Sequence, residues 1–254
     1  MAATCDVIIP FHGRSELVSE CLRALAQSPP PGCTYVVDDG SAHGERRRVE
    51  RACDESGLRC EVVTMARRVG FVGAVNSAWE LCTAPFVMLL NSDAFVRPGV
   101  VGLLGDALRR TAGLAAVGPS STSRRDLMQY RRTPRGEYGG MPGVTPTPFL
   151  TAMCLMLRRA AVGERPFDPV YAPGYFEDLD LCCRLRDEGW ELGIVEGARV
   201  HHVGGATTGR DASRGATMAR NFATFSARWH SRPEQESLEA FLRAVDAPCD
   251  GSVP

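Results

Sequence analysis

The chain has 254 residues, with 29 basic against 30 acidic side chains and a formal net charge of −1. This length allows one large domain or two small fused ones, with a sizeable core in either case. The balanced charge argues against a nucleic-acid-binding protein, which would carry a strongly basic face. The ten cysteines show no Cys-x-x-Cys or Cys/His finger spacing, so we expect neither structural zinc nor a disulfide scaffold.

The same features favour a cytoplasmic protein. Reduced thiols are the normal state of cysteines in the cytosol. The N-terminal residues 1–6 lack the charged-then-apolar pattern of a secretory signal, and no run of 18 apolar residues occurs. We therefore expect no transmembrane segment, with membrane contact at most at the protein surface.

Short apolar strands alternate with amphipathic helices in the first third of the chain. The expected strands are 5–10, 34–37, 60–65 and 85–90, and the expected helices are 15–27, 44–56 and 70–82. Ser15 is the expected N-cap of the first helix, and Pro98 is expected in the first turn of a helix that follows the fourth strand. This alternation predicts a parallel sheet with right-handed crossovers.

The pattern is less regular after Arg110. We interpret residues 115–118 as one more strand, and 149–157 as either a buried strand or a short core segment. A helix is expected from Phe176 to Gly189, a strand over 191–196, and helices over 213–229 and 233–245.

The segment 120–148 is rich in Gly, Pro and Ser and has no apolar period. It contains five arginines against two acidic residues, a local net charge of +3 (five minus two). Two interpretations stay open, a solvated connector or a loop that closes over a ligand. The five arginines are Arg124, Arg125, Arg131, Arg132 and Arg135.

Polar residues follow three of the expected strands, at 10–12, 38–40 and 91–93. Ligands bind in the crevice beyond the carboxyl ends of parallel strands, so these residues are expected at one rim. Several carboxylates at one rim are costly unless a cation or hydrogen-bond donors compensate them. A nucleotide fits this arrangement, because Asp39 can accept a hydrogen bond from a base and Asp93 can reach a diphosphate through a metal. Asp93 alone could equally be a capping residue.

Two further clusters lie later in the chain. Glu177, Asp178 and Asp180 crowd the first turn of the helix after Phe176, where the helix dipole favours acids, so they could be simple caps. The pair His201–His202 precedes two glycines, a pattern that suits a metal or phosphate contact. A Gly-x-Gly-x-x-Gly dinucleotide fingerprint does not follow the first strand.

Together these segments resemble the inverting nucleotide-sugar glycosyltransferases of family 2, with the GT-A fold, and particularly the rhamnosyltransferase-like group. The resemblance runs from Asp6 to Trp229. It rests on the ordered set Val7–Pro10, Val37–Ser41, Val69–Asn76, Leu89–Asp93, Tyr175–Cys182 and His202–Thr207.

The resemblance implies an α/β fold of GT-A type: a mostly parallel, Rossmann-like sheet flanked by helices, with a fused acceptor-side subdomain. Residues 1–94 would form the nucleotide-sugar-binding half, and 95–230 the acceptor-binding and catalytic half of the same domain. Residues 231–254 would form a C-terminal helix and tail.

The resemblance also implies roles for individual residues. Asp178 matches the general base, with Glu177 beside it, and a divalent cation, Mg²⁺ or Mn²⁺, would be held by Asp93 and His202. Asn91 replaces the first acid of the Asp-x-Asp-like motif, as in many relatives of this group, and His201 competes with His202 for the metal or diphosphate contact. The implied donor-binding residues are Pro10, Phe11, His12, Asp39, Gly70, Asn91 and Ser92.

One tension concerns the base. A carboxylate at a helix N-terminus has a lowered pKa and is a weaker base, whereas crowding by Glu177 and Asp180 raises the pKa of Asp178. The sequence leaves the balance open.

The expected reaction transfers a sugar from a nucleotide-diphosphate donor to an acceptor hydroxyl of a sugar or small molecule. The alternatives are a sugar-1-phosphate nucleotidyltransferase, which would need a basic Gly-rich loop after the first strand, and a non-catalytic nucleotide-sugar-binding protein. The donor base, the donor sugar and the acceptor stay open, although the lack of an apolar span mildly favours a soluble acceptor.

Overall fold

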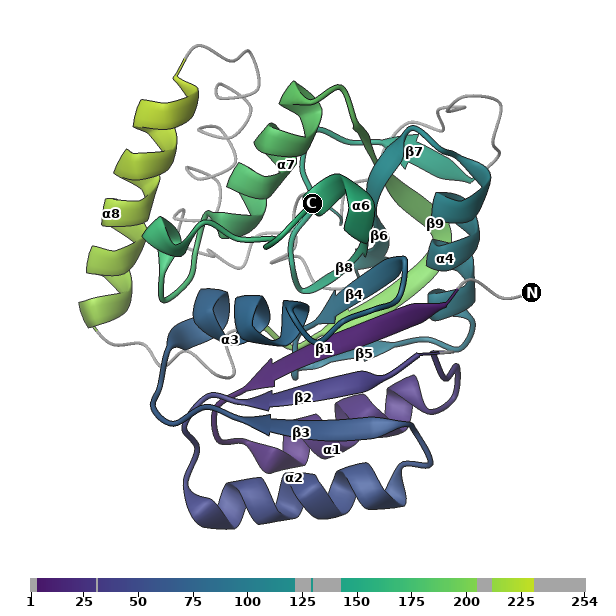
Figure 1. The fold of residues 1–254 in the computed structure, drawn as a ribbon, viewed down its shortest axis with the longest axis vertical. Coiled ribbons are helices and arrows are strands. Elements are labelled where there is room, and N and C mark those ends of the chain that lie inside the picture. Colours follow the sequence, from purple (N-terminus) through teal and green to yellow (C-terminus); the bar gives the residue numbers. More distant parts are fainter. Residues whose placement is uncertain (1–3, 31, 122–128, 130–142, 205–211, 231–254) are drawn as a thin grey trace, which may run out of the picture.

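The computed structural model describes residues 4–30, 32–121, 129, 143–204 and 212–230 (Figure 1). Its strands are β1 (Cys5–Phe11), β2 (Thr34–Asp38), β3 (Cys60–Thr64), β4 (Phe86–Leu90), β5 (Ala94–Val96), β6 (Leu114–Ser121), β7 (Val144–Pro146), β8 (Cys154–Arg158) and β9 (Glu191–His202). Its helices are α1 (Ser15–Leu25), α2 (His43–Glu55), α3 (Gly70–Trp79), α4 (Val100–Arg110), α6 (Arg159–Val162), α7 (Glu177–Asp187) and α8 (Ala212–Trp229), with a 3₁₀ turn η1 at Pro169–Tyr171.

The strands form one mixed sheet in the order β3-β2-β1-β4-β8-β6-β9-β5, with β7 paired to β9. The first four are parallel to one another. Strand β8 is antiparallel to both β4 and β6, and β9 is parallel to β6, so β6 and β9 run in the same direction as β1. Only β5, β7 and β8 run the other way. The predicted mostly parallel sheet flanked by helices is confirmed.

Side chains alternate between the two faces of the central strands, and each face has its own core. Ile8, Val37 and Leu89 pack with α3 and α7 on one face. Ile9 and Met88 pack with α1 and α4 on the other. Such strands, buried on both faces, read in the sequence as continuous apolar runs. In Figure 1, α3 lies in front of the sheet while α1 and α2 lie below it.

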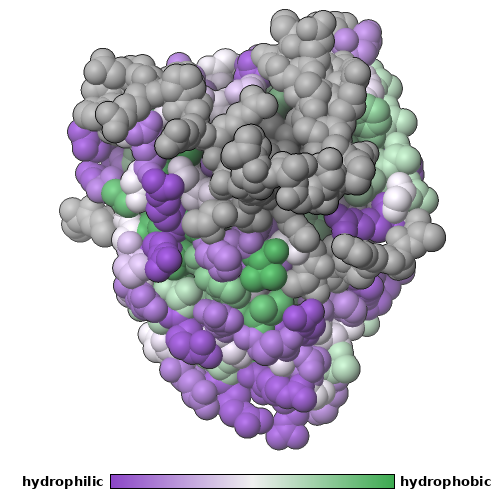
Figure 2. Space-filling view, turned by 180° about the vertical axis from the view of Figure 1, so that it is seen from behind, coloured by the Kyte–Doolittle hydropathy of each residue, from purple (hydrophilic) through white to green (hydrophobic). Residues whose placement is uncertain are grey.

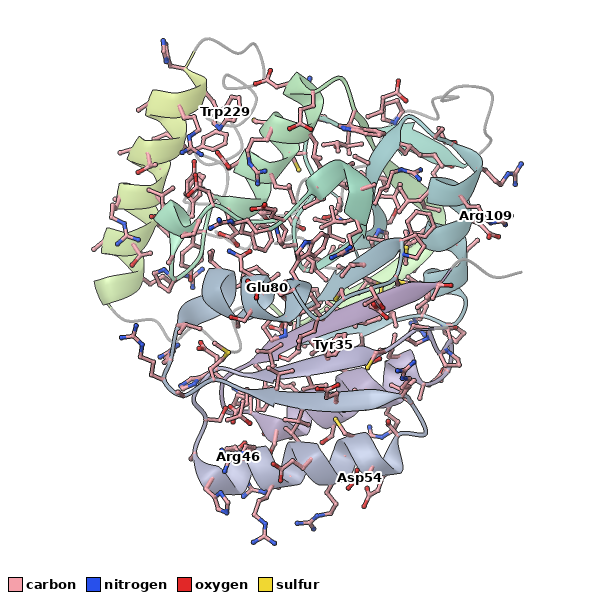
Figure 3. All side chains as sticks on the ribbon, in the orientation of Figure 1. Tyr35, Arg46, Asp54, Glu80, Arg109 and Trp229 are labelled. Atoms are coloured by element: carbon pink, nitrogen blue, oxygen red, sulfur yellow. The ribbon has the colours of Figure 1, made fainter. Side chains whose placement is uncertain are left out.

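Helix α2 turns a polar face outward. Asp54 points away from the sheet in Figure 3, and in the view from behind in Figure 2 the lower part of the molecule is largely hydrophilic. The buried side of α2 consists of Val49 and Cys53. The nine cysteines among the described residues are free thiols, and no described helix is long and apolar enough to cross a membrane.

Two helices begin near the predicted positions, but the roles predicted for Ser15 and Pro98 were wrong. Ser15 is the first residue of α1 rather than its cap, because Glu45 of α2 supplies the cap: its Oε2 accepts from the Ser15 N–H at 2.8 Å. Pro98 lies in a turn, and α4 begins at Val100 after Gly99, whose φ is +88°.

The strands of the second half differ more from expectation. Residues 94–96 form β5, which the sequence analysis did not predict, and β9 continues six residues past the predicted end at Glu196 to His202, because its end pairs with β5 and β6. Residues 149–153 lie outside a strand, although all of them except the half-buried Thr151 are buried, and β8 begins only at Cys154.

Within the long basic segment 120–148, the structure describes the end of β6, Gln129 and the residues from Gly143 onward, which include β7. The five arginines of that segment and the predicted helix 233–245 lie outside the described residues. The proposed division into halves at residue 94 and a tail from 231 stays a prediction, since one sheet runs through both halves.

Candidate active site

A pocket of about 360 Å³ lies at the carboxyl ends of β1, β2 and β4. It brings together side chains from both halves of the chain. The candidate site residues that line it are Pro10, Phe11, His12, Asp39, Gly70, Asn91, Ser92, Asp93, Glu177, Asp178 and His202.

Asp39, just past the end of β2, holds the start of α3. Its Oδ1 accepts from the Val69 N–H at 2.5 Å, and its Oδ2 accepts from the Gly70 N–H at 3.0 Å. The His12 ring is fixed nearby, since its Nδ1 donates to the Asp39 carbonyl at 2.8 Å. A carboxylate offers about four acceptor positions, so Asp39 can bind these amides and still accept from a base.

Gly70 marks a close approach of two backbones. Its φ is +79°, and a Cβ added there would lie 2.3 Å from the Pro173 Cβ and 2.6 Å from the Pro173 oxygen. The same proline accepts from the Val72 N–H at 3.2 Å. Only glycine fits both the backbone conformation and the space, so the pocket wall at 173–175 rests directly on α3.

The end of β4 carries Asp93, which is 3% exposed. Ala94 pairs with His202 in the antiparallel ladder between β5 and β9, and this pairing sets Asp93 Oδ1 3.2 Å from His202 Nε2. His201 points to the other face of β9, where its ring lies 6.0 Å from that of Phe95, and it does not line the pocket. Alternation along a strand explains why only one of the two histidines reaches the pocket.

The acidic pair lies at the N-terminus of α7. It follows two consecutive residues with left-handed backbone, Tyr175 (φ +79°) and Phe176 (φ +70°). Such conformations cost about 1–3 kcal/mol each and persist only where the surroundings hold them. They turn Glu177 and Asp178 toward the pocket.

Burial raises the pKa of Asp178, and the hydrogen bonds that its carboxylate accepts from backbone N–H groups only partly offset this rise. Its Oδ2 accepts from the Ala152 N–H at 3.1 Å and its Oδ1 from the Leu179 N–H at 2.9 Å. For this carboxyl, desolvation therefore outweighs the helix terminus and the amides.

Glu177 is more deeply buried, at 6% exposed, and no described group donates to its Oε2. Burial, and then the charge of Asp178, raises the pKa of Glu177 well above its usual value. Asp180 does not belong to this environment. It faces away from the pocket and binds four side-chain donors, from Tyr171, Arg184, Arg228 and Trp229.

Sequence reasoning missed two cations of the pocket wall. Arg68 lies with its Nε 4.0 Å from Asp39 Oδ2, and the guanidinium of Arg214 lies 5.6 Å from the centre of the Tyr175 ring. Arg68 directly precedes the segment beginning at Val69 and could have been included with it. Arg214 comes from α8, far from every motif, and no local signal identifies it.

The pocket can hold a hard divalent cation with help from a ligand. Among the described residues no group of three His, Cys, Asp or Glu side chains is arranged for a metal. Mg²⁺ sites that serve phosphate chemistry commonly use one or two carboxylates, with phosphate oxygens and water completing the shell. Asp93 with His202 fits this kind of site, and the nearly complete burial of the carboxylate makes a compensating positive charge favourable.

Comparison with known proteins identifies the family. A family model described as Glycosyl transferase family 2 matches residues 6–165. An N-acetylglucosaminyl-diphospho-decaprenol L-rhamnosyltransferase of Mycobacterium tuberculosis is 29% identical over 240 residues, covering 79% of this chain and 76% of that protein. An N-acetylglucosaminyltransferase of Rhizobium leguminosarum bv. viciae is 31% identical over 121 residues, covering 46% of this chain and 28% of that protein.

Solved glycosyltransferase structures share the fold. The mannosyltransferase PcManGT from Pyrobaculum calidifontis, in complex with GDP-Man and Mn²⁺, superposes with a TM-score of 0.65 at 18% identity, over 88% of this chain and 64% of that one. GalNAc-T7 with UDP, GalNAc and Mn²⁺ gives 0.63 at 15% identity, over 79% of this chain and 44% of that one. The predicted GT-A fold is confirmed, and the family match, which spans more than half of the chain, shows that this protein is a glycosyltransferase belonging to glycosyl transferase family 2.

Proposed function

We propose that this chain transfers a sugar from a nucleoside-diphosphate donor to an acceptor hydroxyl, with inversion at the anomeric carbon. The observation that carries the proposal is one pocket lined by three groups: the Asp93–His202 pair, the Asp39 carboxylate and the acidic pair Glu177–Asp178. Structural neighbours crystallised with UDP and with GDP-Man support a nucleotide-sugar donor.

The donor half of the pocket is built from the strand ends. Phe11 and His12, after β1, together with Asp39, would receive the base and ribose, and Asn91 and Ser92 would lie beside the diphosphate. The wall formed by Gly70 and the 173–175 turn would close the site from the side of α3.

The leaving diphosphate needs positive charge. Asp93 and His202 would hold Mg²⁺ or Mn²⁺, and when bound this ion would neutralise the diphosphate as it departs. Arg68 and Arg214 line the same pocket and would add to the positive charge. If the protein needs no metal, these arginines are the side chains that would take over.

Asp178 is proposed as the general base. Inversion requires a base that takes the acceptor's proton while the diphosphate leaves from the opposite face of the sugar, and a positioned base typically contributes about 10²–10⁴-fold. Because burial raises the pKa of Asp178, its ionised form binds a proton more readily than an exposed aspartate does.

The neighbouring acids differ in their hydrogen bonding, which favours this assignment. Asp178 accepts from two backbone N–H groups, an arrangement that stabilises the ionised form. Glu177 has an oxygen without a donor among the described residues and the more strongly raised pKa. On this difference in hydrogen bonding we propose that a proton on the pair resides on Glu177 and that Asp178 is the ionised base.

The test measures what is released from a panel of UDP-, GDP- and dTDP-sugars, with lipid-linked and soluble sugars as acceptors. The rhamnosyltransferase of similar sequence is named for a decaprenol-linked acceptor, which is why the lipid-linked class is included. We expect nucleoside diphosphate release that depends on acceptor, and a product whose anomeric configuration is opposite to that of the donor by NMR. Pyrophosphate release from a nucleoside triphosphate would instead indicate a nucleotidyltransferase, and binding without release would indicate a non-catalytic protein.

Matched variants test the base. Asp178→Asn keeps the size of the side chain but cannot accept the proton, so turnover should fall at least about 10²-fold while nucleoside diphosphate affinity stays nearly unchanged. Glu177→Gln should cost less. A dead Glu177→Gln beside an active Asp178→Asn would reverse the assignment.

A further inference from the structure

We propose that Asn221, in the middle of α8, is a positioning residue for sugar transfer: its side-chain amide holds the 171–175 turn and thereby the Glu177–Asp178 pair. This inference rests on the proposed function of that pair. Asn221 belongs to no motif, does not line the pocket and lies beyond the region matched by the family model.

The contacts of Asn221 are concentrated on one turn. Its Nδ2 donates to the carbonyl oxygens of Tyr171 at 2.7 Å, Gly174 at 2.8 Å and Tyr175 at 3.0 Å. Its Oδ1 accepts from Arg220 Nε at 3.0 Å, and the residue is fully buried at 0% exposed. A single amide thus gathers three carbonyls that point inward and would otherwise have to find other donors in a buried place.

That turn leads directly into the acidic pair. Gly174 and Tyr175 line the pocket, and the left-handed residues Tyr175 and Phe176 immediately precede Glu177. A backbone in this conformation relaxes when its surroundings no longer hold it. Two of the three carbonyls bound by Asn221 belong to Gly174 and Tyr175, so the amide acts at the point where the chain direction is set.

The docking of α8 itself does not depend on Asn221. The Phe176 ring lies 5.7 Å from the Phe222 ring and 5.9 Å from the Phe225 ring. At the far end of the helix, Trp229 donates to Asp180 of α7 at 3.0 Å, and Figure 3 shows Trp229 on the side of α8 that faces α7. The helix should therefore stay in place when the amide is removed, while the turn loses its hydrogen-bond donors.

Removing the Asn221 amide should affect donor affinity and kcat differently. Most residues proposed to bind the donor, namely Phe11, His12, Asp39, Asn91 and Ser92, lie at strand ends, and none of these has a hydrogen bond to Asn221. Removal of Asn221 should therefore change nucleoside diphosphate affinity far less than kcat. The position of Asp178 relative to the acceptor should shift, and a misplacement of about 1 Å can cost about 10²-fold in rate. A residue with a merely structural role would instead lower the folded fraction and leave kcat of the folded enzyme unchanged.

The experiment compares Asn221→Ala with the wild type for kcat, acceptor KM, nucleoside diphosphate Kd and thermal unfolding. Tyr35→Phe is the matched control, because it also removes a side-chain bond to a backbone carbonyl, that of Leu81 at 3.1 Å, on β2 outside the pocket. We expect kcat to fall at least about 10-fold in Asn221→Ala with Kd within about 2-fold of wild type. Tyr35→Phe should lower the unfolding temperature and leave kcat unchanged.

A second variant covers the case in which Asn221→Ala does not fold. Arg220 is exposed, donates to the Ala172 carbonyl in the same turn and binds Asn221, so Arg220→Gln should fold and show a smaller loss of kcat with unchanged Kd. Unchanged kcat in both variants, or equal losses in kcat and nucleotide affinity, would overturn the positioning role. Asp178→Asn separates the two hypotheses: if it stays active, the assignment of the base fails, whereas an inactive Asp178→Asn beside a fully active Asn221→Ala overturns only the role of Asn221.

Discussion

The Asp180→Asn substitution should destabilise the protein by about 2–4 kcal/mol. The Asp180 carboxylate is fully buried and binds four donors: Oδ1 accepts from the Tyr171 hydroxyl at 3.1 Å, Arg228 at 2.9 Å and Trp229 at 3.0 Å, while Oδ2 accepts from Arg184 at 3.0 Å. A hydrogen bond to a charged group contributes about 1.5–3 kcal/mol. The side chains of Arg184 and Arg228 are 31% and 37% exposed and can be resolvated by water, so we assign a loss of about 1 kcal/mol of stability to each of their two bonds. The weaker bonds that an amide accepts from Tyr171 and Trp229 account for the remainder.

The assay is equilibrium unfolding in urea, followed by circular dichroism. Asp168→Asn is the control, because Asp168 also binds Arg228, at 2.9 Å, but its side chain is 32% exposed. Exposed ion pairs contribute about 0–1 kcal/mol, so this control should lose less than about 1 kcal/mol. If the two variants lose the same stability, the four-donor site does not hold α8 against α7 as described.

The other predictions concern the pocket. Gly70→Ala should lower the free energy of unfolding in urea by about 2–4 kcal/mol, because the added Cβ would overlap Pro173 and the φ of Gly70 is +79°. Gly13→Ala is the control: its φ is +63° but no atom lies within 4 Å of the added Cβ, so the loss should be only about 1–2 kcal/mol. Equal losses would contradict the close approach of Gly70 to Pro173. Burial raises the pKa of Glu177, so its stabilising contribution is complete below the unfolded-state pKa and is lost as pH rises through the folded-state pKa. Glu177→Gln should therefore lose less stability than wild type as the pH rises above about 4.5, measured by urea unfolding at a series of pH values. Asp93→Ala should abolish transfer and any metal-dependent nucleotide binding while the unfolding temperature stays near that of wild type, and full activity of the wild type in EDTA would refute the metal.

The central strands could be predicted because each is marked by a pattern within its own few residues. Continuous apolar runs such as Val87–Leu90 are buried on both faces, and the polar residues that follow them line one pocket, as parallel strands require. Strand β5 carries no comparable signal. Its three residues are extended because β9, a hundred residues later in the chain, pairs with them, and such long-range pairing leaves no mark on a short segment.

Contacts between distant helices explain the other differences. Serine is a residue type that commonly caps helices, but at the start of α1 the capping acceptor is the Glu45 carboxylate of α2, which binds the Ser15 N–H. The balance at Asp178 depended on burial, which no pattern of neighbouring residues reveals, and Arg214 reaches the pocket from a helix whose docking is fixed by Asp180 and Phe176. The roles proposed for the pocket residues stay predictions until the variants are measured.

The ladder between β5 and β9 makes the metal pair sensitive to changes in chain length. Ala94 faces His202, and the neighbouring His201 points to the opposite face. Inserting or deleting one residue between Gly197 and Val200 would exchange those faces while keeping a strand that can still pair, since a one-residue shift inverts every side chain beyond it. A one-residue deletion would place Val203 opposite Ala94 and leave no imidazole beside Asp93, whereas a one-residue insertion would place His201 there. An aligned histidine is therefore informative only when its strand register is also known.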